Sequence, residues 1–184
     1  MGVSLYIVSF SILIVFAAVV NRIILVSSSP QSGCFPTDEK IQIMEDYVLK
    51  KYVKVPVSSS WTELNVSPPG AVDVKCVAHS VSIRCHKDQA PTLLLLHGTA
   101  ASATSYTECF EALSQDFHVL ALDLPRFGRS TTEFDSTAKG RRALQETGTL
   151  FGVEFIQKFL ESQNINAVVL MGHFHGGFVS LHFA

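Results

Sequence analysis

The chain lacks any concentration of positive charge. Its 14 Lys and Arg residues are scattered and are balanced by 16 Asp and Glu residues, which gives a net charge of −2. Nucleic-acid-binding domains carry a basic patch or stripe, so we do not expect nucleic acid as a partner. The chain also lacks an internal repeat and a low-complexity tract. Its 184 residues leave room for one domain.

Cysteine is also scarce. The chain has four cysteines, Cys34, Cys76, Cys85 and Cys109. An even number permits two disulfides in an oxidising compartment. The pattern from Ala71 to His86 predicts two short strands around His79-Ser80, and Cys76 and Cys85 would face each other across that hairpin. A disulfide and buried thiols are both compatible with this pattern, because a buried Cys behaves as a small apolar residue.

Charged side chains are missing from Gly2 to Val20, and the apolar stretch continues after Arg22 to Val26. At about 25 residues it is long enough to span a bilayer. We expect residues 1–27 to form an uncleaved transmembrane signal anchor. The alternative is a cleaved signal peptide, with small residues at Val26-Ser27-Ser28 for the cleavage site.

The evidence on membrane orientation is divided. Arg22 follows the span, which weakly favours a cytosolic domain. The glycosylation sequon Asn65-Val66-Ser67 and the four cysteines suit a lumen instead. We expect a single-pass membrane protein of the secretory pathway whose domain is luminal or extracellular.

Residues 28–70 are predicted to be a linker that contains one short amphipathic helix. Thr37-Asp38-Glu39 is typical of a helix start. Four apolar residues then recur at helical spacing, namely Ile41, Met44, Val48 and Tyr52. We expect the helix to pack on the domain. The alternative, that it lies on the membrane beside the anchor, is opposed by its four acidic residues. From Val55 to Gly70 the chain is loop-like.

Apolar strands alternate with helices from Pro91 onward. The predicted strands are Thr92–Leu96, Phe117–Leu122 and Ala167–Met171, and the predicted helices are Ser105–Gln115, Thr147–Ser162 and a segment from Gly176 onward. Nearly continuous apolar strands separated by helices are typical of a parallel sheet covered on both faces. The predicted fold class is therefore α/β, with a mostly parallel sheet in a domain of residues 71–184.

Three motifs follow these strands in order. They are Leu95-Leu96-His97-Gly98-Thr99-Ala100, Asp123-Leu124-Pro125-Arg126-Phe127-Gly128-Arg129-Ser130 and Val168-Val169-Leu170-Met171-Gly172-His173-Phe174-His175-Gly176-Gly177. Together they resemble the α/β-hydrolase superfamily, in its esterase, C–C hydrolase and epoxide-hydrolase-like branch. The resemblance covers about residues 72–184, the N-terminal half of that fold, so we expect the sheet to be truncated after the third motif.

The resemblance implies that the third motif is a nucleophile elbow, a sharp strand-to-helix turn whose middle residue attacks the substrate. Phe174 occupies that position and has no nucleophilic atom. The other elbow residues would be Gly172, His173, Gly176 and Gly177. The catalytic acid and His that the family supplies after the elbow are absent from the chain, so no competent catalytic residue can be assigned.

The resemblance also implies an oxyanion hole built from two backbone N–H groups. Thr99 or Ala100 would supply one and His175 the other. For the Asp123 motif we favour a structural role. A metal site at His173 and His175 is disfavoured because two His side chains need a third ligand, so neither a metal nor a cofactor is expected.

We therefore expect a membrane-anchored α/β-hydrolase-like protein that is catalytically incompetent as given. Its ancestors would have acted on small, largely apolar esters, amides or epoxides. Three alternatives stay open: a pseudoenzyme module that binds a small apolar ligand or a partner, a fragment without a function of its own, and an active hydrolase if the sequence is an incomplete or erroneous gene model.

Overall fold

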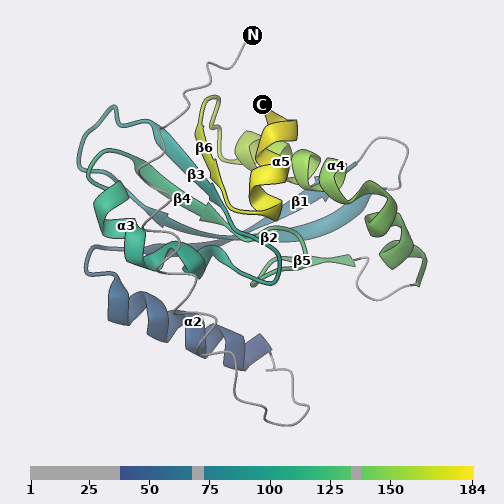
Figure 1. The fold of residues 1–184 in the computed structure, drawn as a ribbon, viewed down its shortest axis with the longest axis horizontal. Coiled ribbons are helices and arrows are strands. Elements are labelled where there is room, and N and C mark those ends of the chain that lie inside the picture. Colours follow the sequence, from purple (N-terminus) through teal and green to yellow (C-terminus); the bar gives the residue numbers. More distant parts are fainter. Residues whose placement is uncertain (1–37, 68–72, 134–137) are drawn as a thin grey trace.

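The computed structural model describes residues 38–67, 73–133 and 138–184. Within them a single mixed sheet has the strand order β1-β2-β4-β3-β6, with β5 attached to β2 (Figure 1). The strands are β1 (Ser58–Val66), β2 (Val74–Ile83), β3 (Thr92–Leu96), β4 (His118–Leu122), β5 (Thr131–Thr132) and β6 (Val169–Gly172). The helices are α2 (Asp38–Tyr52), the 3-10 turn η1 (Ala103–Tyr106), α3 (Thr107–Leu113), α4 (Ala138–Ser162) and α5 (His175–Phe183).

The parallel part of the sheet is centred on β3. Leu96, the last residue of β3, is in register with Leu122 of β4 on one side and with Gly172 of β6 on the other. The three strands therefore end at one edge of the sheet, and the three sequence motifs begin there together. The predicted α/β class is confirmed. The open sheet is mixed because β2 pairs antiparallel with β1, β4 and β5.

Helices cover both faces of this sheet, and β3 shows why. Leu94 and Leu96 belong to the core formed with α4 and α5. The alternate residues Leu93 and Leu95 belong to the core beneath α2 and α3. Because side chains alternate between the faces of a sheet, a fully apolar strand contributes buried side chains to both cores. In Figure 1, α2 lies on the opposite side of the sheet from α4 and α5.

The hairpin predicted around His79-Ser80 is wrong, as is the loop predicted from Val55 to Gly70. β2 is one continuous strand through that point, and its partner is β1. The first half of β1 is exposed and begins with three serines, so its sequence lacks the alternation of apolar and polar residues that predicts a strand. Its polar side chains pair across the strands instead: Ser60 Oγ lies 3.0 Å from Ser80 Oγ.

The continuous β2 strand also rules out the Cys76–Cys85 disulfide. Cys76 lies within the strand and Cys85 lies beyond its end. Nine residues of extended chain separate them by about 30 Å. Cys85 and Cys109 are free thiols, and the Cys85 thiol donates to the Gln115 carbonyl oxygen at 3.5 Å. Cys34 lies outside the described residues.

None of the helices in the described ranges is both long and apolar enough to cross a membrane. The signal anchor predicted for residues 1–27 lies outside those ranges, and it stays a prediction. The helix predicted after Thr37 is confirmed as α2, and it packs on the domain through Leu49. The predicted apolar face is wrong in part, because Met44 and Tyr52 are exposed.

Candidate functional site

The turn between β6 and α5 presents Phe174 at the carboxyl edge of the sheet. The residue has φ 49° and ψ −110°, a backbone conformation that non-glycine residues rarely adopt. A strained strand-to-helix turn of this kind is what exposes the attacking residue in a nucleophile elbow. The Phe174 side chain is 75% exposed. The turn therefore holds a phenyl ring in the place where an elbow ordinarily offers a nucleophilic atom.

Glycine is required on both sides of this turn by close backbone approach. A Cβ on Gly172 would lie 2.5 Å from the carbonyl carbon of Gly176, and a Cβ on Gly176 would lie 2.2 Å from Leu96 O. Two backbone hydrogen bonds close the contact with the end of β3, from His173 N to Leu96 O at 3.0 Å and from Gly176 N to His97 O at 3.1 Å. The elbow is thus built against β3.

The two predicted sources of oxyanion-hole N–H groups lie at the same edge. The loop after β3 turns sharply at Ala100, where φ is 58°. A Cβ on Gly98 would lie 3.4 Å from Phe174 Cβ, so the Thr99–Ala100 loop starts in contact with the elbow. His175 is the first residue of α5, and N–H groups of a first helical turn have no intrahelical acceptor. Their role as an oxyanion hole stays a prediction.

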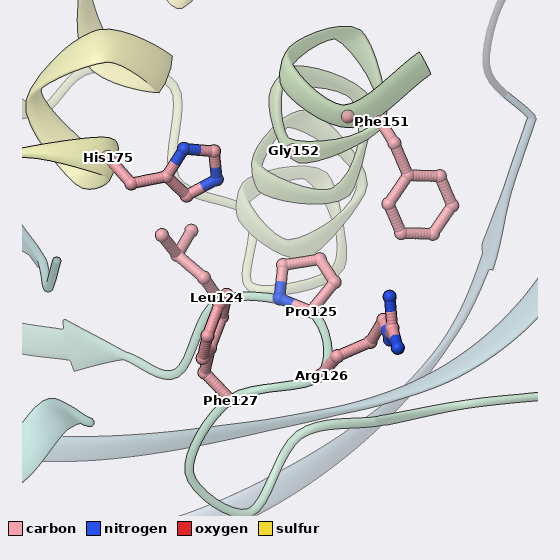
Figure 2. A pocket seen from close by; sticks show the side chains of 8 residues that line it. Leu124, Pro125, Arg126, Phe127, Phe151, Gly152 and His175 are labelled. Carbon is pink, nitrogen blue, oxygen red and sulfur yellow. The ribbon is translucent and has the colours of Figure 1, made fainter. Parts of the chain in front are cut away.

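Gly177 follows in the first turn of α5. A Cβ there would lie 3.2 Å from Gly172 O, so it too faces the β6 end of the elbow. The His175 side chain leaves the turn on the other side, toward the loop after β4 (Figure 2). Its ring centroid lies 6.5 Å from that of Phe127.

His97 is a buried, neutral link between two of the motifs. Its Nδ1 donates to Gly98 O at 2.7 Å, and its Nε2 accepts from Leu124 N at 2.9 Å. One ring nitrogen must therefore carry a proton and the other a lone pair. Burial lowers the pKa of His97, which agrees with this state. With both nitrogens engaged, His97 positions the loops and is not available as a base.

Asp123 holds the second motif together, in agreement with the structural role favoured for it. Its Oδ2 accepts from His79 Nδ1 at 2.7 Å and from Arg129 N at 2.9 Å, while its Oδ1 accepts from Ala103 N at 2.6 Å. The loop wraps closely around the carboxylate because Gly128 adopts φ 55°, and a Cβ there would lie 2.3 Å from the Asp123 carboxyl carbon.

Sequence reasoning missed three residues that complete this buried cluster: Glu45 of α2, His79 of β2 and Arg129. Arg129 Nε lies 2.7 Å from Glu45 Oε2, and the two side chains are 8% and 9% exposed. Arg129 lies within the second motif, whereas Glu45 and His79 come from segments far from it in the chain and no local motif marks them.

This cluster also has the composition of a metal site. Among the described residues, Glu45, His79 and Asp123 bring candidate ligand atoms within 4.8 Å of one another. Arg129 already supplies positive charge to Glu45 there, and His79 Nδ1 is bonded to Asp123. Burial raises the pKa of Glu45, with the nearby Asp123 charge acting in the same direction. We interpret the cluster as a hydrogen-bonded ion-pair network.

A cavity of about 310 Å³ lies beside the elbow, between the loop after β4, α4 and the start of α5 (Figure 2). The lining residues are Leu124, Pro125, Arg126, Phe127, Gly148, Phe151, Gly152 and His175. Its walls are mainly apolar, and Arg126 and His175 contribute the nitrogen-bearing groups. A few polar groups in an apolar hollow of this size are typical of a small-molecule site.

Known proteins share these features. Residues 91–184 match the family described as the alpha/beta hydrolase fold. A 1-acylglycerol-3-phosphate O-acyltransferase of Arabidopsis thaliana is 34% identical over 98 residues, which are 53% of this chain and 22% of that protein. The rat 1-acylglycerol-3-phosphate O-acyltransferase ABHD5 is 37% identical over 89 residues, 48% of this chain and 23% of that protein.

Among solved structures, the carboxylesterase CesB of Bacillus subtilis superposes with a TM-score of 0.54 at 18% identity. The superposition covers 79% of this chain and 44% of CesB, and at this identity it shows the fold alone. The chain spans less than a quarter of the length of the two curated relatives. The family match covers half of the chain and includes the parallel strands and the elbow, so the chain belongs to the α/β-hydrolase fold family.

Proposed function

We propose that this protein is a membrane-anchored α/β-hydrolase-like protein that does not hydrolyse substrates. Phe174 carries the proposal. The elbow keeps its strained backbone and close glycine contacts, yet the residue at its apex offers only carbon. A covalent acyl-enzyme needs an oxygen, sulfur or nitrogen nucleophile there. His97 does not compensate as a general base, because both of its nitrogens are bonded.

The membrane anchor at residues 1–27 and a luminal or extracellular domain are parts of the same proposal. The uncharged apolar run supports the anchor. Asn65 supports a luminal domain because it is exposed on β1, at an edge of the sheet. An oligosaccharide attached to this side chain would project from the protein surface.

A second function, ligand binding, is favoured by the cavity beside the elbow. Its apolar walls suit a small apolar ligand, and Arg126 is positioned to contact a negatively charged group. The two curated relatives described above are named for 1-acylglycerol-3-phosphate, a molecule with an acyl chain and a phosphate. An anionic lysophospholipid is therefore the ligand class that we propose for this cavity.

The first test is labelling of the purified full chain with a fluorophosphonate probe. We expect no labelling above that of heat-denatured protein, because no nucleophile is present at the elbow. Inhibitor-sensitive labelling of the folded chain would refute the proposal of a non-hydrolytic protein. Alkaline carbonate extraction tests the anchor separately, and release of the chain into the supernatant would contradict it.

The second test measures displacement of a fluorescent lysophosphatidate by unlabelled lysophosphatidate. Arg126→Gln should weaken binding about tenfold, because a charge-assisted hydrogen bond to the phosphate is lost. Lys87→Gln, an equal charge change at an exposed lysine paired with Asp116, is the matched control. Equal affinities for the two variants would remove the case for this cavity.

A further inference from the structure

The helix α2 has one face that nothing in the described structure covers. Its inner face is buried against the domain through Glu45 and Leu49. On the outer face, Ile43, Met44 and Tyr47 are 62%, 62% and 61% exposed. Single exposed apolar residues are ordinary. Residues three and four positions apart on a helix are neighbours, so Tyr47 lies beside both Met44 and Ile43, and the three form one apolar patch.

Lysines surround this patch. Lys40, Lys50 and Lys51 are all exposed on α2. The Nζ atom of Lys51 lies 5.5 Å from the ring centroid of Tyr47 and 5.2 Å from that of Tyr52. These cation–π contacts hold a positive charge directly beside the apolar patch. A side-chain hydrogen bond to Tyr47 raises the pKa of Lys51 further above its ordinary value.

Two of the four acidic residues of α2, which oppose a membrane contact in the sequence, are paired with Arg129 in the structure. Glu45 is buried against Arg129 Nε at 2.7 Å. Asp46 Oδ1 accepts from Arg129 Nη2 at 2.9 Å. One arginine therefore pairs with two of the four acids and offsets one of their two negative charges. The other two, Asp38 and Glu39, occupy the first two positions of the helix, at the opposite end from Lys50 and Lys51.

We propose that the outer face of α2, defined by Ile43, Met44, Tyr47, Lys50 and Lys51, lies in the interface of an anionic lipid bilayer. Basic amphipathic helices bind such surfaces through buried apolar side chains and attraction to anionic lipid. Tyrosine is enriched at the level of the lipid headgroups, which suits Tyr47 beside Lys51. Charge complementarity disfavours a neutral protein groove, and the short distance in sequence to the proposed anchor favours a bilayer over an acidic groove as the occupant.

The position of α2 in the chain supports this contact. The apolar run proposed as the anchor ends at Val26, and α2 begins at Asp38. The intervening residues 27–37 reach at most about 40 Å when fully extended, so an inserted anchor keeps α2 close to the bilayer. The inference rests in part on the proposed anchor, and because anionic lipid is concentrated in the cytoplasmic leaflet it requires the cytosolic orientation indicated by Arg22 in place of the luminal one. It also predicts a contact that the anchor alone does not produce.

The experiment uses the full chain reconstituted in phosphatidylcholine vesicles with 30% phosphatidylserine and brominated acyl chains. Trp61 is the single tryptophan of the chain, so Trp61→Phe gives a silent background. Met44→Trp in this background places the reporter in the patch. Leu150→Trp places it on α4 at a residue of comparable exposure. We expect emission from Met44→Trp to be quenched by at least half and that from Leu150→Trp to be unchanged.

Lys50→Glu with Lys51→Glu should reduce the quenching of the Met44→Trp reporter. Lys75→Glu with Lys87→Glu changes the net charge equally at exposed positions of other elements and should leave the quenching unchanged. Flotation of the vesicles reports the anchor independently. A chain that floats while Met44→Trp stays unquenched overturns the α2 contact and leaves the anchor standing. Equal quenching at both reporter positions, or quenching independent of phosphatidylserine, also overturns the inference.

Discussion

The guanidinium of Arg129 reaches the carboxylate of Glu45 at 2.7 Å, and this contact joins the loop after β4 to α2. The same guanidinium donates to Gln42 O at 2.8 Å. The backbone N–H of Arg129 meanwhile binds the Asp123 carboxylate. One residue therefore connects the edge of the sheet that carries the elbow to the helix that we propose to lie on the membrane.

Removal of Arg129 should destabilise the fold strongly. Arg129→Met leaves the Glu45 carboxylate buried without its partner, and breaking one side of a buried pair costs about 3 kcal/mol or more. Chemical unfolding of the purified chain measures the effect. The double variant Glu45→Met with Arg129→Met should recover most of this loss. Arg84→Met, at an exposed arginine, is the control, and an equal loss there would exclude a specific role for the ion pair.

His97 should make stability depend on mildly acidic pH. Its pKa in the folded chain is lowered from the ordinary value of 6.5 by burial, so the unfolded chain binds more protons at this residue between the two values. The contribution is complete above about pH 6.5 and is lost as pH falls through the lowered pKa. Two titratable groups act on His97, since the Asp123 charge raises its pKa and the His175 charge lowers it.

The free energy of unfolding should therefore fall more steeply from pH 7 to pH 5 in the parent chain than in His97→Gln. Urea unfolding across that range supplies both curves. Parallel curves would mean that His97 does not set this dependence.

The two glycines Gly176 and Gly148 should respond in opposite ways to alanine. In Gly176→Ala the new methyl group would meet Leu96 O at 2.2 Å, so the elbow must move away from β3. We expect a loss of about 3 kcal/mol or loss of the folded state. Gly148 lies in α4 with nothing within 4 Å of its Cβ position. Gly148→Ala should add about 1 kcal/mol by helix propensity alone. Thermal unfolding distinguishes them, and a similar shift in both would contradict the close packing of the elbow.

At position 174, glycine should give a more stable protein than alanine. At φ 49° a Cβ is strained, so Phe174→Gly should be more stable than Phe174→Ala by about 1 kcal/mol. Leu181 is a matched control because it is exposed and helical, and there Ala should exceed Gly by a similar amount. The same order of stability at both positions would show that the elbow backbone is relaxed.

Local patterns in the sequence were sufficient for the parallel half of the sheet. The sequence predicts Thr92–Leu96 at its observed bounds because a short apolar run between Pro91 and His97-Gly98 is typical of a strand buried on both faces. The elbow was also recognisable locally, because each close contact in its turn requires a glycine at a particular position. Neither feature depends on a distant partner for its signal.

Tertiary structure decided the rest. The polar start of β1 becomes a strand only because β2 supplies its backbone hydrogen-bond partners, and those partners are distant in the chain. The cluster of Glu45, His79, Asp123 and Arg129 forms because folding removes their charges from water together, which makes pairing necessary. Four acidic residues on α2 were visible in the sequence. Which of them form ion pairs was settled by Arg129, a residue outside α2, since an ion pair depends on distance in space and leaves no local pattern in the sequence.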